Sequence, residues 1–259
     1  MKMGINLTHE SQAPSQKSTA SANKEWKKLI ADFQQPHVGK AVWQIINTLV
    51  PIAAIWVACY FLKDISLLYC IPLALLGGLF LVRTFIIFHD CGHGSFFKSK
   101  RANSVVGFIT GLLTFTPYRM WSWEHARHHA TNGDLDRRGI GDIWTLTVEE
   151  YVSGSRRLQL SYRFIRNPII LFVFGPLVLF IILQRFSHSK SKGRERQSVY
   201  VMNATLVGWC VGMSMIFGFL PWLVIQLTMM SIASLFGLWL FYVQHQFEDT
   251  YWATNEDWD

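Results

Sequence analysis

The fold is decided by residues 65–93, which read ISLLYCIPLALLGGLFLVRTFIIFHDCGH. The first part, from Ile65 to Phe88, is almost wholly apolar, and as a helix rising 1.5 Å per residue it can cross ~30 Å of hydrocarbon. The run ends on His89 and His93, which are four residues apart and therefore share one helical face. We expect a membrane span that places two imidazoles at one edge of the bilayer.

The composition of the whole chain is typical of a membrane protein. Its 259 residues are 51% hydrophobic and 15% aromatic, and a soluble domain of this length rarely carries so much apolar sequence. In such a protein, the net charge of +7 indicates topology and contact with anionic lipid rather than with nucleic acid. The four cysteines show no paired or zinc-type spacing, and we expect ordinary buried thiols at the three in or beside apolar runs, Cys59, Cys70 and Cys210.

Apolar runs divide the chain into a polar arm, residues 1–40, and a membrane domain, residues 41–259. A helix is expected within the arm over residues 23–34. The predicted spans are residues 42–62, 65–88, 199–219 and 221–243. Runs at 104–117 and 168–184 are too short to cross and are expected to be interfacial or re-entrant. The predicted fold class is an all-α membrane protein with four transmembrane helices in two hairpins, interfacial or re-entrant helices, and a cytoplasmic histidine-rich cap.

The distribution of Lys and Arg predicts which side of the membrane each segment faces. With four spans, every Lys and Arg except Arg83 and Lys63 lies on the same side as the N-terminus, and positive residues favour the cytoplasm. A full span at 168–184 would instead export the basic loop 185–196 and separate His245 from the other clustered histidines. We therefore predict that the N-terminus and the histidine clusters are cytoplasmic.

Six histidines are candidate metal ligands. Five of them fall in two clusters whose spacings of three and four residues place the rings on shared helical faces, and the sixth follows the last span. They are His89, His93, His125, His128, His129 and His245. Nitrogen-rich sites without thiolate suit iron, zinc, copper or nickel, and this number exceeds one structural zinc site, so we expect two metal ions. A pair of irons open to dioxygen can break an unactivated C–H bond, and a site at the hydrocarbon boundary favours a lipid chain as substrate.

Carboxylates near these histidines are candidates for orienting the rings, because a ligating histidine normally donates its other N–H to a carboxylate or a carbonyl. Asp90 and Glu124, each adjacent to a candidate ligand, are the two that we favour. The other nearby acids are Asp134, Asp136, Asp142, Glu248 and Asp249.

Two segments resemble the histidine boxes of membrane fatty acid desaturases. HDCGHGSFF, residues 89–97, is similar to the first box, HxxxH, and WEHARHHAT, residues 123–131, is similar to the second, HxxHH. The stretches GDLDRRGIGDIW, residues 133–144, and QHQFED, residues 244–249, resemble the bacterial acyl-lipid branch. The resemblance implies two non-haem iron ions, dioxygen as co-substrate, an electron donor such as ferredoxin, and conversion of a lipid-linked acyl chain to a cis-unsaturated one. It also implies the bacterial inner membrane as location.

The family's third box, another HxxHH, has no counterpart in this sequence. His245 matches the extra ligand that follows the final span, which leaves six ligands where the resemblance implies eight or more. We expect a truncated product or a fragment of a longer desaturase, rather than a complete but degenerate relative. Accordingly, we expect the chain as printed to bind iron weakly and to lack desaturase activity.

Two alternatives remain open from the sequence. A related di-iron lipid hydroxylase or carotenoid ketolase performs the same kind of C–H cleavage and carries similar motifs. A histidine-rich membrane protein that binds or transports metal belongs to a different class. Transport would require polar residues near the bilayer midplane, and the spans carry almost none beyond Arg83 and Asn203.

Overall fold

A computed structural model describes residues 35–258 of the chain. The helix expected over residues 23–34, and most of the predicted polar arm, lie outside the described residues. The elements in chain order are α2 (Val38–Leu62), α3 (Leu67–Gly92), α4 (Lys100–Leu113), α5 (Tyr118–Thr131), α6 (Val148–Ser153), α7 (Arg156–Ile165), η2 (Ile170–Phe174), α8 (Gly175–Ile181), η3 (Leu183–Arg185), α9 (Gly193–Phe217) and α10 (Phe219–His245). Within residues 35–258, β pairing is limited to one isolated bridge.

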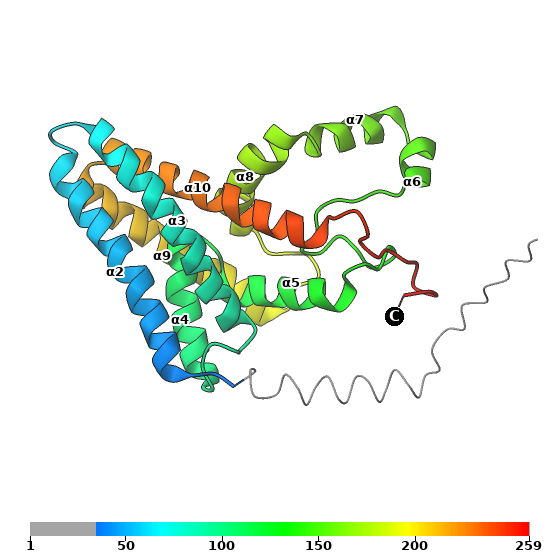
Figure 1. Cartoon of the computed structure of the whole chain (residues 1–259), viewed down its shortest axis with the longest axis horizontal. Helices are drawn as coiled ribbons and strands as arrows, with labels where there is room; N and C mark the ends of the chain where they lie inside the picture. The colour runs from blue at the N-terminus through cyan, green and yellow to red at the C-terminus, as the bar shows by residue number, and fades with distance from the viewer. Residues whose placement is uncertain (1–34, 259) are drawn as a thin grey trace, which may run out of the picture. The chain divides into compact units, whose positions relative to one another are not determined.

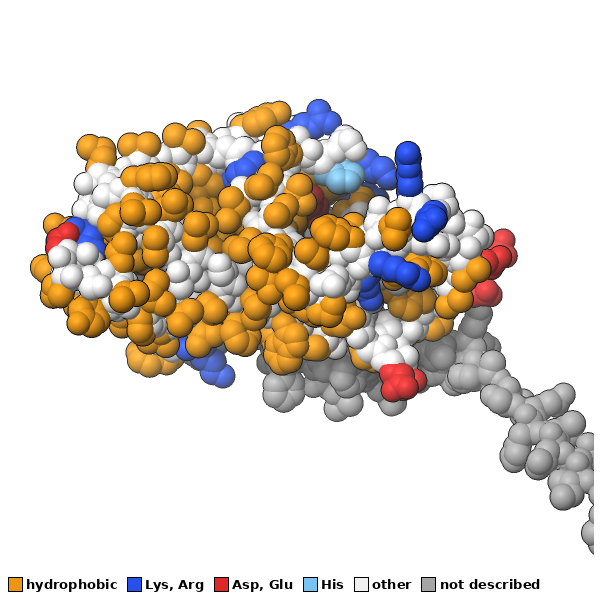
Figure 2. Space-filling view, turned by 90° about the horizontal axis from the view of Figure 1, so that it is seen from above, with side chains coloured by type: hydrophobic (Ala, Val, Ile, Leu, Met, Phe, Trp, Pro, Cys, Tyr) orange, Lys and Arg blue, Asp and Glu red, His pale blue; other side chains and the backbone are white. Residues whose placement is uncertain are grey.

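Among residues 35–258, four helices are long and apolar enough to cross a membrane, and they form two hairpins (Figure 1). In the turn between α2 and α3, Lys63 pairs with Asp64 at 2.8 Å, and the Ser66 hydroxyl accepts the Leu68 N–H to cap α3. Gly218 joins α9 to α10 with a φ of 82°, a conformation that L side chains rarely adopt. Hydrophobic side chains cover most of the face seen in Figure 2, as expected for a surface in contact with lipid. The predicted fold class, an all-helical membrane protein with four spans, is confirmed.

The second and fourth spans are longer than the apolar runs that predict them. Helix α3 continues past Phe88 to Gly92, and α10 continues past Val243 to His245. Hydropathy ends a predicted span where the first polar residue appears, whereas the backbone hydrogen bonds of a helix continue across it. As a result, His89 and His245 lie in the last turns of spanning helices and are held by the membrane bundle itself.

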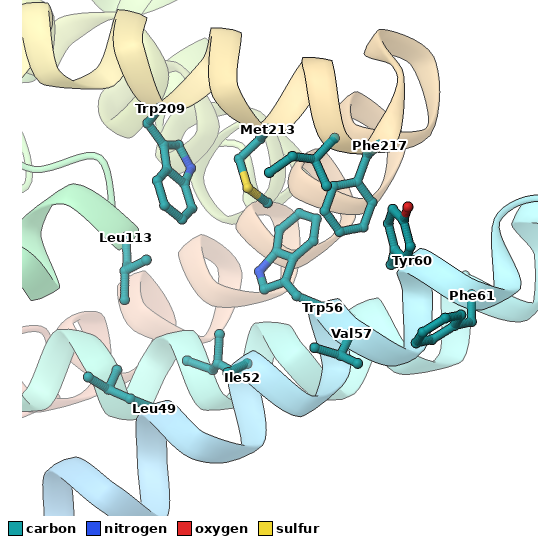
Figure 3. A pocket seen from close by; sticks show the side chains of 12 residues that line it. Leu49, Ile52, Trp56, Val57, Tyr60, Phe61, Leu113, Trp209, Met213 and Phe217 are labelled. Carbon is teal, nitrogen blue, oxygen red and sulfur yellow. The ribbon is translucent and has the colours of Figure 1, made fainter.

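An apolar groove of about 570 Å³ lies between α2 and α9 (Figure 3). Trp56 of α2 and Trp209 of α9 line its two walls, and Leu113 closes one end. The lining includes none of the six candidate histidines. This groove therefore does not reach the predicted metal ligands.

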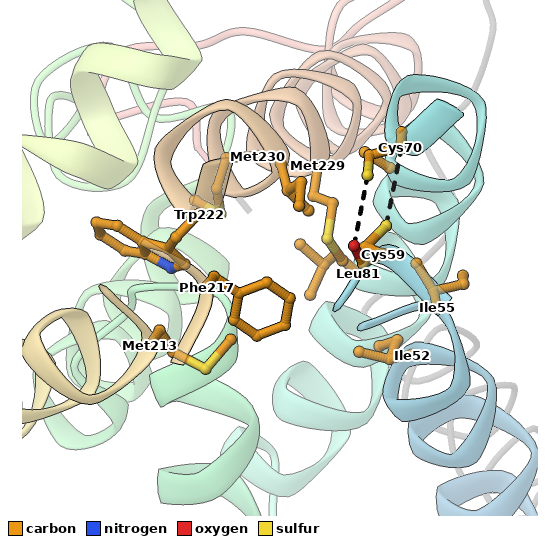
Figure 4. Packing of buried hydrophobic residues seen from close by; sticks show 12 residues of the cluster. Ile52, Ile55, Cys59, Cys70, Leu81, Met213, Phe217, Trp222, Met229 and Met230 are labelled. Atoms are coloured by element: carbon orange, nitrogen blue, oxygen red, sulfur yellow. Dashed lines mark hydrogen bonds between the residues drawn. The ribbon is translucent and has the colours of Figure 1, made fainter. Parts of the chain in front are cut away.

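The core of the bundle is built from small and sulfur-containing side chains as well as branched ones. Cys59 and Cys70 are fully buried where α2 meets α3, and each thiol faces the other residue's carbonyl oxygen (Figure 4). Met229 and Trp222 of α10 pack against the same cluster. The expectation of ordinary buried thiols fits Cys59 and Cys70, which are free and buried, whereas Cys210 is free and only partly buried.

Glycine lets α3 and α10 approach each other closely. A Cβ added at Gly78 would lie 2.5 Å from the Ile232 Cβ and 2.8 Å from the Met229 carbonyl oxygen. Because backbone cannot move aside as a flexible side chain can, we expect Gly78→Ala to lower the free energy of unfolding by about 1–3 kcal/mol. Thermal unfolding in detergent measures this. Gly208→Ala is the matched control, because a Cβ there meets nothing within 4 Å; an equal loss in both variants would contradict the prediction.

The two short apolar segments pack against the spans, and both are shorter than a span. The run predicted at 104–117 is α4 followed by a tight reversal in which Phe115 has a φ of 56°. The run at 168–184 forms η2, α8 and η3, which together are bent by 64° relative to α7.

Both ends of the segment 170–185 lie near the histidine-bearing helices. Before it, Arg166 donates to the Gln246 side chain at 3.2 Å, next to His245. After it, His188 lies with its ring centroid 5.8 Å from that of Trp123 in α5. A segment that leaves and returns to one end of the bundle is consistent with a re-entrant path; that assignment stays a prediction.

Candidate metal centre

Four histidines from α3 and α5 direct their Nε2 atoms toward one point. His89 lies in the last turn of α3, and His93 is its C-cap; His125 and His129 lie one turn apart on α5. The Nε2 atom of His125 is 3.0 Å from that of His89, 3.0 Å from that of His93 and 3.1 Å from that of His129. All four ligand atoms lie within 4.8 Å of one another, so a single metal ion could be held between them. We call this set the four-histidine cluster.

His128 and His245 form a second meeting point, the histidine pair. Their Nε2 atoms are 3.0 Å apart, although 117 residues separate them in the chain. The Nδ1 of His245 faces the Phe241 carbonyl oxygen at 2.8 Å, and the Nδ1 of His128 contacts the Asp142 carboxylate. Both of these oxygens only accept, so each Nδ1 carries a proton, and a ring with that single proton has its lone pair on Nε2. Two lone pairs that face each other at this distance favour a cation between them.

The electrostatics of three members of the cluster, His93, His125 and His129, favour neutral rings with free lone pairs. Burial, together with the neighbouring histidines, lowers the pKa of His125 to about 3. Burial is also the main cause that lowers the pKa values of His93 and His129. Metal ligation requires the deprotonated imidazole, so at neutral pH these groups can bind an ion without first losing protons.

The supporting carboxylates agree only partly with the expectation from sequence. Asp90 accepts the Nδ1–H of His89 at 3.1 Å, as expected. Glu124 forms no hydrogen bond with a histidine in the described part of the chain; burial raises its pKa to about 7. Asp142 holds His128 instead, and its second oxygen accepts the Gly139 N–H at 3.0 Å. The glycine at 141 has a φ of 76°, which lets the loop return so closely that a Cβ there would lie 3.1 Å from the Cβ of His128.

Trp121 has a role that its position in the sequence does not predict. Its ring stacks on that of His125 with centroids 4.3 Å apart and an interplanar angle of 18°. Its far edge fits against Gly92, where a Cβ would lie 2.8 Å from the indole. The glycine within the first cluster therefore lets α3 approach the tryptophan that fixes one central imidazole. From sequence alone, a tryptophan beside a span is more readily explained as an interfacial anchor.

The segments that follow α5 and α10 are joined directly. Leu135 donates to the Ala253 carbonyl oxygen, and Ala253 donates to that of Gly133, both at 2.9 Å. Asp134 is fully buried at this bridge, where it contacts Arg137 and accepts the Asp136 N–H. Because these segments carry on from His128 and His245, the bridge helps to hold the histidine pair in register.

The fold and the site together define a class. The chain is an integral membrane protein in which clustered histidines, at one end of four spanning helices, can hold metal. The donor set of neutral nitrogens without thiolate fits iron as well as other first-row metals.

Comparison with known proteins gives the family. The sequence model of the fatty acid desaturase family matches residues 65–259. The chain is 43% identical to a fatty acid desaturase of Bacillus subtilis (strain 168), over 94% of this chain and 69% of the relative. This protein therefore belongs to the fatty acid desaturase family, whose members are oxidoreductases, and the resemblance seen in its two histidine boxes is confirmed.

More distant relatives have more specific names. The chain is 25% identical to the sn-1 acyl-lipid omega-3 desaturase (ferredoxin) of Nostoc sp. (strain 36), over 88% of this chain and 64% of that one. It is 30% identical to the sn-1 oleoyl-lipid 12-desaturase of Synechocystis sp. (strain ATCC 27184 / PCC 6803 / Kazusa), over 51% of this chain and 36% of that one. The chain thus spans between about a third and two thirds of the length of these relatives.

Proposed function

We propose that this protein forms the di-iron part of an oxygen-dependent acyl-lipid desaturase, which introduces a cis double bond into a lipid-linked acyl chain. The observation that carries the proposal is the division of six imidazoles into a cluster of four and a pair, which offers two adjacent positions for cations. The ligands that we propose are the residues of the four-histidine cluster together with His128 and His245.

The protein's own residues would bind, orient and support the ions. His125 lies at the centre of the four-histidine cluster and is fixed by the Trp121 ring. Asp142 keeps the proton of His128 on Nδ1 and so leaves Nε2 free to bind metal. When bound, the irons would supply the activation of dioxygen that C–H cleavage requires.

The same proposal includes partners and orientation. The substrate would be the acyl chain of a membrane lipid, and the electron donor a ferredoxin or a similar carrier; two relatives with ferredoxin in their names, from Synechocystis sp. and Nostoc sp., support this choice. We also propose the bacterial inner membrane, with the histidines on the cytoplasmic side, because nearly all Lys and Arg lie on that side of the four spans.

A metal transporter is a weaker candidate. The two polar residues of the spans noted from the sequence are used in structural contacts: Arg83 donates to Asn47 at 2.7 Å, and the amide of Asn203 exchanges hydrogen bonds with Arg185 at 2.8 and 2.9 Å. A path for ions needs polar groups that are free to bind them.

Fatty acid analysis of a desaturase-deficient bacterium tests the proposal. Because the chain spans 69% of the Bacillus subtilis relative, we would express it both as printed and substituted for the matching part of that relative. We expect the chimera to produce fatty acids with one additional cis double bond, and His125→Ala within the chimera to abolish them. Hydroxylated products would contradict desaturation. The fatty acid profile of cells that express the chain as printed tests the prediction that this chain is inactive.

A further inference from the structure

A second groove, of about 380 Å³, is lined by α4 and by the first turns of α5 and α9. Arg101 of α4, Arg119 of α5 and Arg194 of α9 line it, and each is the second residue of its helix. The Arg119 N–H donates to the Ser198 hydroxyl at 3.1 Å, which joins α5 to α9 at the groove floor. This site is distinct from the metal centre, since none of the candidate histidines lines it.

The three arginines lack local compensation. None of the ion pairs formed within residues 35–258 involves any of them, and their guanidinium groups make no hydrogen bonds there. The N-terminal end of a helix carries partial positive charge, so a cation in the first turn is unfavourable on its own. Glu195 follows Arg194 on α9 but does not line the groove. The groove therefore concentrates positive charge and is complementary to an anion.

The rest of the groove is largely apolar, and its aliphatic side chains are exposed. Val105 and Ile109 of α4 are 52% and 47% exposed, and Val201 of α9 is 46% exposed. From Arg101 to Ile109 the helix rises about 12 Å, of which the apolar stretch from Val105 to Ile109 takes about 6 Å, so the groove offers a charged end and an apolar end within reach of one lipid molecule. A soluble phosphate would use the arginines alone, whereas an anionic phospholipid would use both parts of the groove.

We infer that this groove binds an anionic phospholipid, with its headgroup phosphate on the three arginines and an acyl chain along the wall of α4 and α9. The lipid belongs to the leaflet on the histidine side of the membrane. The inference needs only that the chain spans a bilayer, so it stands apart from the proposed desaturase activity.

Lipid titration followed by native mass spectrometry tests the inference on the purified chain in detergent. The ligands are phosphatidylglycerol, phosphatidylcholine with the same acyl chains, and glycerol 1-phosphate. The variant is Arg101→Gln with Arg194→Gln; Arg119 is kept because α5 carries candidate metal ligands. The matched control is Arg156→Gln with Arg157→Gln, which removes the same charge from the exposed first turn of α7.

We expect the unmodified chain to prefer phosphatidylglycerol over phosphatidylcholine. At roughly fivefold per arginine, the double variant should bind phosphatidylglycerol about 25-fold more weakly, while the control pair is unchanged. Replacing the same two arginines by lysine should restore most of the binding, and it serves as the fold-preserving variant if the glutamine variant does not fold. Equal binding by variant and control, equal affinity for the two lipids, or equal competition by glycerol 1-phosphate would overturn the inference.

Discussion

Replacing His125 by alanine should abolish metal binding at the four-histidine cluster, with an affinity for ferrous iron at least about 100-fold lower. The loss of a supporting partner alone costs 10- to 100-fold, and His125 is a central ligand rather than a support. Its Nε2 lies within 3.1 Å of three other imidazole nitrogens, so no other single histidine is close to so many of the others. Anaerobic titration with ferrous iron measures the affinity, and iron per chain after removal of free metal gives the stoichiometry.

Two further variants make this result specific. His245→Ala removes one member of the histidine pair and should spare the four-histidine cluster, which it does not join. His188→Ala removes a histidine whose ring lies near Trp123 of α5 and is not a candidate ligand. It should change the affinity for neither ion. Helix content by circular dichroism shows whether each variant is folded. Iron affinity in folded His125→Ala equal to that of His188→Ala would contradict the assignment.

Local spacing predicts each histidine cluster, because residues three and four apart share a helical face regardless of the rest of the fold. Hydropathy predicts the four spans for a similarly local reason. In lipid, each apolar run must satisfy its backbone hydrogen bonds within itself, and it does so as a helix. What spacing cannot predict is which clusters meet. His93 and His125 are 32 residues apart, and His128 and His245 are 117 apart, so their contacts depend on how α3, α5 and α10 pack.

The carboxylate that supports His128 shows the same limit. Proximity in sequence favours Glu124, which is adjacent to a candidate ligand, yet Glu124 forms no hydrogen bond with a histidine within residues 35–258. Asp142 reaches His128 from 14 residues away because the loop returns through Gly139 and Gly141, both with positive φ. Periodicity carries no information about such a loop. The arginines of the second groove are a further case, since they come from three separate helix starts.

Replacing Asp142 by asparagine should lower the affinity of the histidine pair for its ion by about 10- to 100-fold. The affinity of the four-histidine cluster should be unchanged. Asp142 now accepts two hydrogen bonds, from the Nδ1–H of His128 and from the Gly139 N–H. An asparagine has only one accepting oxygen, so its NH₂ group must face one of these two donors. If the NH₂ group faces His128, the ring proton moves to Nε2. That proton can then be donated to the Nε2 of His245, 3.0 Å away, and the hydrogen bond occupies the position of the metal.

The proton itself gives a readout that a purely structural defect would not move. In metal-free protein labelled with ¹⁵N-histidine, the shifts of His128 should report a proton on Nδ1 in the unmodified chain and on Nε2 in Asp142→Asn. Asp64→Asn is the control, since it removes the same charge from the turn between α2 and α3, far along the chain from any candidate ligand. An Nδ1 proton retained in Asp142→Asn together with unchanged iron affinity would show that the carboxylate does not set the state of His128. A shifted proton with weakened iron binding would show instead that one residue of the loop after α5 controls whether the pair can accept a metal ion.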